Sequence, residues 1–140
     1  MAEKEIKISN QVEQIAFLAE ALENLSDEWN IPMNVTLNLN LVLEELVSNI
    51  IFYGYEDTNK HEISIHLSFI NETMTVRLED DGKEFNPLLY AEADIHLSAE
   101  DRNIGGLGIF FVRKMMDDIC YERSNNRNIL TMSKSIKPTE

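Results

Sequence analysis

The chain is poor in basic residues, and this shortage excludes whole classes of partner. It carries 12 lysines and arginines against 25 acidic residues, a formal net charge of −13 over 140 residues. Surfaces that bind nucleic acid or anionic membranes need clustered Lys and Arg. We therefore expect no direct nucleic-acid partner and no membrane, whereas a basic protein partner is compatible with this charge.

Cysteine and long apolar runs are equally scarce. Cys120 is the one cysteine, so no internal disulfide can form, which is ordinary in a reducing compartment. We expect Cys120 to be a buried, inert thiol, because its neighbours have the character of a strand. The longest apolar run, 104–112, is far shorter than the ~20 residues of a membrane span, and residues 1–10 lack the apolar region of a signal peptide. A cytoplasmic protein is expected.

The chain does have enough length and apolar content for one packed domain over residues 1–140. Ser9 and Asn10 are the expected N-cap candidates of the first helix, and residues 35–43 fit a strand as well as a helix, although the helical stripe through residue 54 is longer. Periodicity predicts strands at 4–9, 61–70, 73–81, 118–124 and 127–135, and helices to about residue 25, from about residue 33 to 54, and at 106–117. This order predicts an α+β fold with a mostly antiparallel sheet and helices on one face.

One carboxylate and one amide side chain stand out on the second predicted helix. Glu45 and Asn49 are one turn apart and project from the same edge of its apolar stripe, while Glu44 points away. A carboxylate and an amide at the rim of a core are well placed to face a pocket. An ordinary solvated helix edge would carry the same pair.

Two glycine segments follow this helix in the chain. Asp80-Asp81-Gly82 ends a strand in a turn, where a carboxylate could accept from an exocyclic amine and Gly82 would let a flat ring approach the backbone. Gly105-Gly106-Leu107-Gly108 begins a helix, so its N–H groups could cradle phosphates. The second segment lacks the Gly-Lys-Ser/Thr of a P-loop and does not follow a strand as a dinucleotide-binding turn does.

Other features of the chain point to no further site. His61 and His66 are expected at solvated positions, and no His, Cys and carboxylate cluster has the spacing of a metal site. Residues 83–104 have no periodicity and are expected to form a lid, with a short helix around 88–93.

Taken together and in order, these segments resemble the GHKL ATPase superfamily, or Bergerat fold. Glu45-Leu-Val-Ser-Asn49 is similar to its N-box, Asp80-x-Gly82 to its first glycine box and Gly105-Gly-Leu-Gly108 to its second. Within the superfamily the chain resembles the stand-alone anti-sigma-factor serine/threonine kinases of bacterial partner-switching systems. The resemblance implies a two-layer α/β sandwich with a mostly antiparallel, mixed sheet and a lid over the nucleotide.

The resemblance also implies roles for individual residues. Glu45 would be the catalytic base, and Asn49 would bind Mg²⁺ that bridges the phosphates of ATP. Asp80 would bind the adenine amine with help from Thr131 on the last strand. Residues that would bind the rest of the nucleotide are Gly82, Arg102, Gly105, Gly106, Leu107 and Gly108.

One residue departs from the family pattern. Glu84 stands where the first glycine box usually has its second glycine. A carboxylate there would repel phosphate if it pointed inward, or would have no effect if it faced solvent.

The resemblance implies a protein-serine kinase that phosphorylates a STAS-type anti-anti-sigma protein and sequesters a sigma factor or a similar regulator. A homodimer is the family expectation. The alternative is a non-catalytic partner-switching module that acts only by sequestering a protein, and Glu84 is the residue that supports it.

Overall fold

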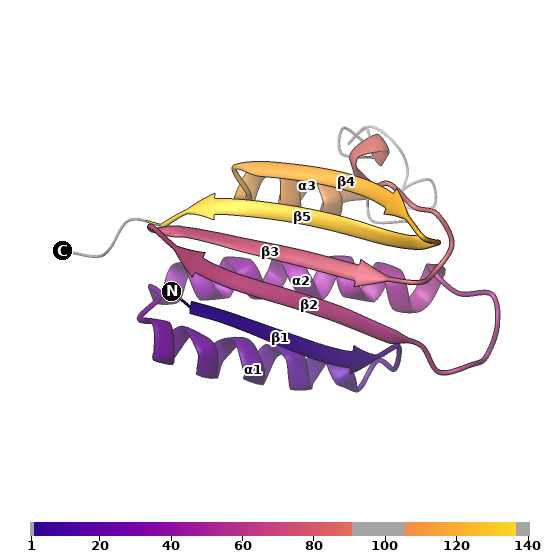
Figure 1. Cartoon of the computed structure of the whole chain (residues 1–140), viewed down its shortest axis with the longest axis horizontal. Helices are drawn as coiled ribbons and strands as arrows, with labels where there is room; N and C mark the ends of the chain where they lie inside the picture. Colours follow the sequence, from indigo (N-terminus) through magenta and orange to yellow (C-terminus); the bar gives the residue numbers. More distant parts are fainter. Residues whose placement is uncertain (1, 91–105, 137–140) are drawn as a thin grey trace.

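A computed structural model describes residues 2–90 and 106–136 as a five-stranded sheet with helices on one face. The strands lie in the order β1-β2-β3-β5-β4, and the helices α1, α2 and α3 lie behind the sheet in the view of Figure 1. The elements are β1 (Ala2–Ser9), α1 (Gln14–Trp29), α2 (Met33–Tyr53), β2 (Glu62–Ile70), β3 (Thr73–Asp80), the 3₁₀ turn η1 (Pro87–Tyr90), α3 (Gly106–Met115), β4 (Asp118–Ser124) and β5 (Arg127–Ser135). This confirms the predicted α+β architecture and the predicted order of elements.

Two tight turns set the register of the sheet. Asn71 and Glu72 join β2 to β3 with φ of 52° and 62°, and Asn125 and Asn126 join β4 to β5 with φ of 52° and 61°. Two successive residues of positive φ are typical of turns that match the twist of antiparallel strands. All four strand pairings among the described residues are antiparallel, so the expectation of a mixed sheet is wrong for this part of the chain.

Helix α2 supplies much of the core, which resolves the ambiguity of residues 35–43 in favour of a helix. Leu39, Leu43 and Leu46 are buried, and Val42 and Val47 are fully buried. Its 21 residues reach a mean hydropathy of 1.4 over 18 of them, which by length and composition would also suit a membrane span. Because its buried stripe packs in the core of the domain, this composition is that of a central helix.

The predicted cap of α1 is wrong. The helix begins at Gln14, and Glu13 at its N-cap makes no side-chain hydrogen bond to it. The side chain of Asn10 instead contacts the loop before β2, where its Oδ1 accepts a hydrogen bond from the His61 backbone N–H at 2.9 Å. The Asn10 side chain, which the local sequence pattern assigned to the N-cap of the helix, therefore makes a tertiary contact instead. The helix also continues to Trp29, beyond the predicted end near residue 25.

Cys120 is exposed, so the expectation of a buried thiol is wrong. β4 is an edge strand, and its residues alternate between the helix side and the open side. Cys120 pairs with Thr131 of β5, whereas the flanking residues of β5, Leu130 and Met132, are the buried ones. The apolar neighbours of Cys120 are on the other face of the strand, so the thiol itself faces solvent.

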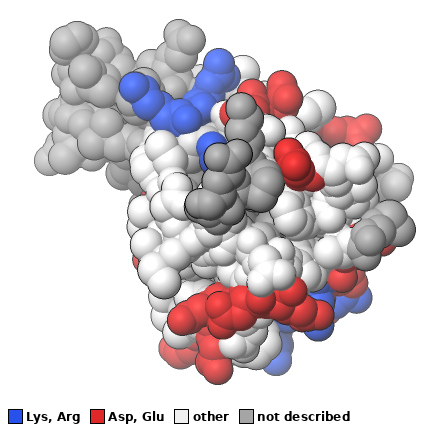
Figure 2. Space-filling view, turned by 90° about the vertical axis from the view of Figure 1, so that its left-hand side faces the viewer, with Lys and Arg blue, Asp and Glu red and all other residues white. Residues whose placement is uncertain are grey.

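The charge of the chain is unevenly distributed. Figure 2 shows a band of acidic side chains along the side of the molecule that carries α1 and β1, with basic side chains next to it, and both basic and acidic side chains at the opposite side. The exposed acidic residues of α1 are Glu20, Glu23, Asp27 and Glu28. The net charge of −13 is therefore concentrated in part on one helix surface.

Candidate nucleotide-binding site

A cavity lies between the C-terminal half of α2 and the ends of β3, β4 and β5. Its walls are largely apolar, with a few polar groups that converge on it, as is typical of a small-molecule site. The apolar walls are Leu46, Ile50, Tyr53, Leu78, Phe85, Pro87, Tyr121 and Leu130, and the polar lining residues are Asn49, Asp80, Lys83 and Asn128.

Helix α2 places Asn49 in this cavity. Its Nδ2 is buried and has no hydrogen-bond partner among the described residues. A buried amide without a partner costs free energy unless a ligand or water satisfies it. Asn49 also offers an amide oxygen, the kind of ligand that Mg²⁺ takes together with substrate phosphates. The unpartnered amide of Asn49 thus fits a nucleotide that carries Mg²⁺ on its phosphates.

Glu45 lies one helical turn before Asn49 and is partly buried. It does not line the cavity itself. Burial, and then the neighbouring Glu44 carboxylate, raise the pKa of Glu45. A carboxylate with a raised pKa is a better proton acceptor at neutral pH than an ordinary surface glutamate.

Asp80 ends β3 and is only 4% exposed. Its Oδ1 accepts two hydrogen bonds, from the Gly82 backbone N–H at 2.9 Å and from Asn128 Nδ2 at 3.0 Å. Burial raises the pKa of Asp80, and these two hydrogen bonds oppose that rise. Both of these bonds end on Oδ1, so Oδ2 is the atom left to accept from a ligand in the cavity.

Gly82 lies where only glycine fits. A Cβ at this position would lie 2.6 Å from the carbonyl oxygen of Gly54, at the end of α2. The next residue, Lys83, donates its backbone N–H to the same carbonyl at 2.8 Å. The turn after β3 is thus held directly against the C-terminus of α2, which brings Asp80 and Asn49 to one cavity.

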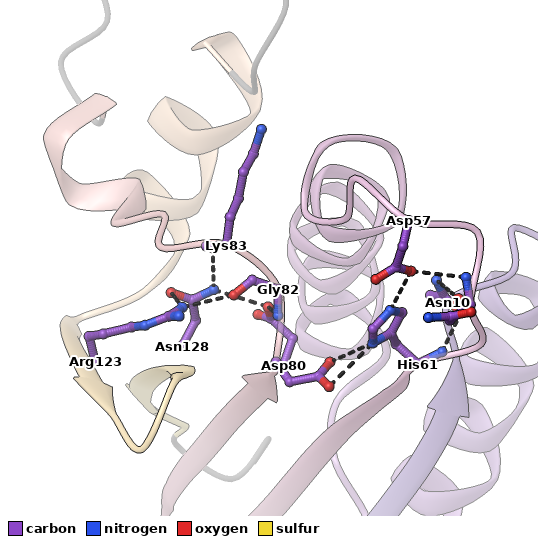
Figure 3. Close-up of polar contacts among 10 residues, drawn as sticks. Asn10, Asp57, His61, Asp80, Gly82, Lys83, Arg123 and Asn128 are labelled. Atoms are coloured by element: carbon purple, nitrogen blue, oxygen red, sulfur yellow. Dashed lines mark hydrogen bonds and ion pairs between the residues drawn. The ribbon is translucent and has the colours of Figure 1, made fainter.

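Asn128 is a site residue that the sequence reasoning missed. It lies opposite Asp80 in the β3–β5 register and is 7% exposed. Its Nδ2 donates to Asp80 Oδ1 and to the Lys83 carbonyl at 2.9 Å, and its Oδ1 accepts from Tyr121 Oη at 2.6 Å. Figure 3 shows Asn128 between Asp80 on one side and Arg123 on the other. The pairing of Asn128 with Asp80 could have revealed this role, but predicting it requires the register of two strands that are far apart in the chain.

Thr131, the residue expected to assist Asp80, is not brought to it. It pairs with Arg77, three residues before Asp80 along β3, a separation of about 10 Å at the usual rise of a strand. It also alternates with the buried Leu130 and Met132, so its side chain is on the face of the sheet away from the cavity. The role assigned to Thr131 is therefore wrong, and Asn128 makes the contact instead.

The departure at Glu84 is accommodated at the surface. The Glu84 side chain is exposed. Its two neighbours are both held by Asn128, since Asn128 Nδ2 donates to the Lys83 carbonyl and the Phe85 N–H donates to Asn128 Oδ1 at 3.2 Å. A polar side chain from β5 therefore fixes the backbone on each side of the residue that replaces the usual glycine.

His61 is more enclosed than expected. Its side chain is 16% exposed, with Nε2 2.8 Å from Asp57 Oδ1 and Nδ1 3.2 Å from both carboxylate oxygens of Asp81. Its ring stacks on Tyr55 with centroids 4.1 Å apart. The hydrogen bond that His61 makes to the Asp57 carboxylate, and then the one to Asp81, raise the pKa of His61 against the effect of burial. The side chain is therefore partly enclosed and not fully solvated, and these contacts join the loop after α2 to the end of β3. For His66, a 3.1 Å contact between Nε2 and Glu3 Oε1 likewise replaces full solvation.

The second glycine segment is described only in part. α3 begins at Gly106 and includes Leu107 and Gly108, as expected for a helix that starts in this motif. Gly105, Arg102 and most of the expected lid lie outside the described residues. The 3₁₀ turn η1 at Pro87–Tyr90 replaces the first part of the short helix expected near residue 88.

A single-layer antiparallel sheet covered by helices on one face, with a buried aspartate and an asparagine facing one cavity, defines a nucleotide-binding sandwich of the GHKL type. The model of the histidine kinase-like ATPase domain family matches residues 8–134. The chain belongs to this family.

Curated relatives extend the comparison. The chain is 26% identical over 116 residues to the serine/threonine-protein kinase BtrW of Bordetella bronchiseptica, covering 81% of this chain and 79% of that one. It is 25% identical over 109 residues to the anti-sigma F factor of Clostridium novyi, covering 77% and 76%. It is 22% identical over 135 residues to the serine-protein kinase RsbW of Bacillus velezensis, covering 93% and 83%. The expected resemblance to partner-switching kinases is thereby confirmed.

Solved structures bear out the fold. The chain is similar to a histidine kinase domain from Erythrobacter litoralis, with a TM-score of 0.57 at 16% identity, covering 89% of this chain and 60% of that one. It is also similar to the histidine kinase AdeS of Acinetobacter baumannii, with a TM-score of 0.50 at 16% identity, covering 97% and 69%. At this identity the likeness concerns the fold alone, and this chain spans only 60% of the Erythrobacter chain.

Proposed function

We propose that this protein is an ATP- and Mg²⁺-dependent protein-serine kinase of a cytoplasmic partner-switching system. In this proposal one domain, residues 1–140, phosphorylates a STAS-type antagonist and sequesters a sigma factor or a similar regulator. The observation that carries the proposal is the convergence of Asp80 and Asn49 at one cavity, with Gly82 holding the turn after β3 against the end of α2. Glu45 lies one helical turn before Asn49. The names of the relatives, kinases and an anti-sigma factor, agree with it.

ATP would lie with its adenine against Asp80 and its phosphates toward α3. An ionised aspartate is only an acceptor, so it suits the exocyclic amine of adenine. The glycines Gly105, Gly106 and Gly108 and the N-terminus of α3 would bind the phosphates, with Arg102 as a further phosphate contact. Asn49 would hold Mg²⁺ through its amide oxygen; when bound, the ion neutralises phosphate charge.

Glu45 would serve as the general base. Its carboxylate takes the proton of the substrate serine as the hydroxyl oxygen bonds to the γ-phosphorus, and the bond from that phosphorus to the bridging oxygen of ADP breaks. Phosphoryl transfer depends mainly on positioning and charge neutralisation, so a single base suffices. The raised pKa of Glu45, caused first by burial, supports this role.

Exposed apolar side chains support the sequestering half of the proposal. Met33, Leu37 and Leu41 are 78%, 59% and 50% exposed, and they lie on successive turns of one side of α2. No charged residue occurs between positions 33 and 43. An uncharged apolar stripe on a strongly acidic protein is typical of a surface that binds another protein, either the regulator or a second copy in a homodimer.

The second candidate is a non-catalytic module that only sequesters a protein. The presence of Glu84 in the first glycine box favours it, as does the position of Glu45 outside the cavity lining. The exposure of Glu84 weakens this alternative, because a solvated carboxylate repels phosphate little.

The two candidates are separated by Glu45→Gln, with Glu44→Gln as the matched control from the same helix. Calorimetry with ATP and Mg²⁺ measures binding, and transfer of labelled γ-phosphate to a panel of STAS-type proteins measures activity. The kinase proposal expects Glu45→Gln to bind ATP as the wild type does and to lose transfer by at least ~100-fold. Glu44→Gln should keep ATP binding and most of the transfer, because it removes only the smaller of the two effects that raise the pKa of Glu45. Wild-type ATP binding without transfer to any serine protein would favour the sequestering module, and no binding at millimolar ATP would refute the kinase.

A further inference from the structure

The sheet has no strand beyond β1 among the described residues. β1 pairs with β2 alone and is the first strand in the order β1-β2-β3-β5-β4. In an antiparallel pair, every second residue directs its N–H and C=O groups away from the partner strand. The outward groups of β1 can therefore form hydrogen bonds with a strand from another chain, as open sheet edges commonly do.

A groove of about 430 Å³ lies between this edge and helix α1. Figure 1 shows α1 alongside β1, and residues 4–7 of β1 form one wall of the groove. Three apolar residues spaced four apart on α1, Phe17, Ala21 and Leu25, contribute to the other wall. Phe17 is 52% exposed, so an aromatic surface is open to solvent directly beside an open strand edge.

A row of polar residues follows the apolar row along α1. Glu20, Asn24 and Glu28 also line the groove, each three positions after an apolar residue, and all three are exposed. Neither glutamate forms an ion pair within the part of the chain that the structure describes. At the rise of an α-helix, the two carboxylates are about 12 Å apart along the helix axis.

This spacing matches that of a strand laid along β1. Alternate residues of a strand face the same side, so residues i and i+4 of an added strand would be about 13 Å apart on the side that faces α1. A lysine or arginine at each position would cover the apolar row with its aliphatic part and place its charge on Glu20 or Glu28. The residue at i+2 would face Ala21 and would be apolar.

A second copy of this chain fits the edge poorly. On the side that faces α1, its β1 would present Lys4, Ile6 and Ile8, which supply a basic residue at only one of the two positions. Glu5 and Lys7 lie on the other face, where they pair with each other at 3.5 Å. Pairing of two β1 strands would also bring the acidic α1 helices of both copies to one edge, where like charges repel.

We propose that the groove between β1 and α1 binds an extended segment of a protein partner, which adds to the sheet as a strand beside β1 and carries basic residues at positions i and i+4. This inference goes beyond the proposed kinase function and does not rest on the nucleotide site. It gives the acidic surface of α1 a role that the nucleotide site leaves open.

The first test titrates the free protein with two peptides of the same composition, followed by NMR in about 150 mM NaCl to limit long-range attraction. Thr-Arg-Thr-Leu-Thr-Arg-Thr places both arginines on one face of a strand, whereas Thr-Thr-Arg-Arg-Leu-Thr-Thr places them on opposite faces. We expect the first peptide to bind roughly tenfold more tightly, because it alone can reach both carboxylates, and to slow amide hydrogen exchange in β1. Equal affinities, or no binding at millimolar peptide, would overturn the inference.

The second test removes charge from the groove and from the surface beside it. Glu20→Gln combined with Glu28→Gln removes two charges from the groove. Glu23→Gln combined with Asp27→Asn removes two charges from the same helix outside the groove lining and is the matched control. We expect the first pair to weaken binding of the alternating peptide by roughly tenfold and the control pair by less than about threefold. An equal loss would show only the attraction of an acidic protein for a cationic peptide, and would refute the groove.

The third test concerns the apolar row and the identity of the occupant. Phe17→Ala should weaken binding of the alternating peptide, whereas Val12→Ala, at an exposed apolar position outside the groove lining, should not. Urea unfolding checks that every variant is folded. In analytical ultracentrifugation, a wild-type dimer that the peptide dissociates would assign the edge to a second copy and overturn the inference. None of these measurements includes nucleotide, so a failure of the kinase proposal leaves their outcome unchanged.

Discussion

Replacing Asp80 by asparagine separates the contribution of this carboxylate to binding from its effect on stability. Asp80→Asn keeps the size of the side chain and an oxygen that can accept from Gly82 and Asn128, but it removes the negative charge. A hydrogen bond to a charged group contributes about 1.5–3 kcal/mol. Since about 1.4 kcal/mol corresponds to a factor of ten, we expect roughly tenfold to 150-fold weaker ATP binding at pH 7.5, measured by calorimetry with Mg²⁺.

The stability of this variant should change in the opposite direction. Burial raises the pKa of Asp80 in the folded chain, so the folded state holds the proton more tightly than the unfolded state does. As pH rises between the ordinary pKa and the raised one, the unfolded chain binds fewer protons than the folded chain, and wild-type stability falls. At pH 7.5 the neutral asparagine avoids this loss. We expect Asp80→Asn to be at least as stable as the wild type in urea unfolding.

Asp118→Asn serves as the control, because Asp118 is exposed at the start of β4 and away from the cavity. It should change neither ATP affinity nor the urea midpoint. Two results would refute the reasoning for Asp80. ATP affinity within twofold of the wild type would remove Asp80 from the binding site, and a clear loss of stability at pH 7.5 would make its carboxylate a structural acceptor.

Further predictions concern the core and one histidine. Leu43 is 0% exposed, so Leu43→Ala should lower the free energy of unfolding by about 2–5 kcal/mol, whereas Leu37→Ala, at a position 59% exposed, should stay within about 0.5 kcal/mol in the same urea titration; equal effects would contradict the assignment of the buried face of α2. The pKa of His61 is raised first by its bond to Asp57 and then by Asp81, so its contribution to stability is complete below its ordinary pKa and disappears as pH rises through the raised one. The difference in unfolding free energy between wild type and His61→Gln should therefore be larger at pH 5.5 than at pH 8.5, and a difference independent of pH would show that the ring acts by stacking on Tyr55 alone.

Features of the fold that depend on local pattern could be predicted from the order of the residues. The stripe through Leu39, Leu43 and Leu46 predicted α2, because side chains three and four apart on a helix share one face. The alternating runs at 61–70, 73–81, 118–124 and 127–135 predicted four of the strands, because successive side chains of a strand face opposite sides. The N-box and glycine-box residues also indicated the family directly.

The polar side chains that meet at the site could not be predicted in this way, because their contacts depend on strand pairing. Asn128 reaches Asp80 because β5 pairs with β3 in a register that crosses 48 positions of the chain, and a shift by one residue would turn Asn128 to the other face. The same register removes Thr131 from the cavity, and the pairing of β4 with β5 leaves Cys120 exposed. Asn10 is drawn from the start of α1 to the backbone of His61. Such contacts join residues far apart in the chain, so no local periodicity records them, and the folded sheet alone fixes which partner each polar group finds.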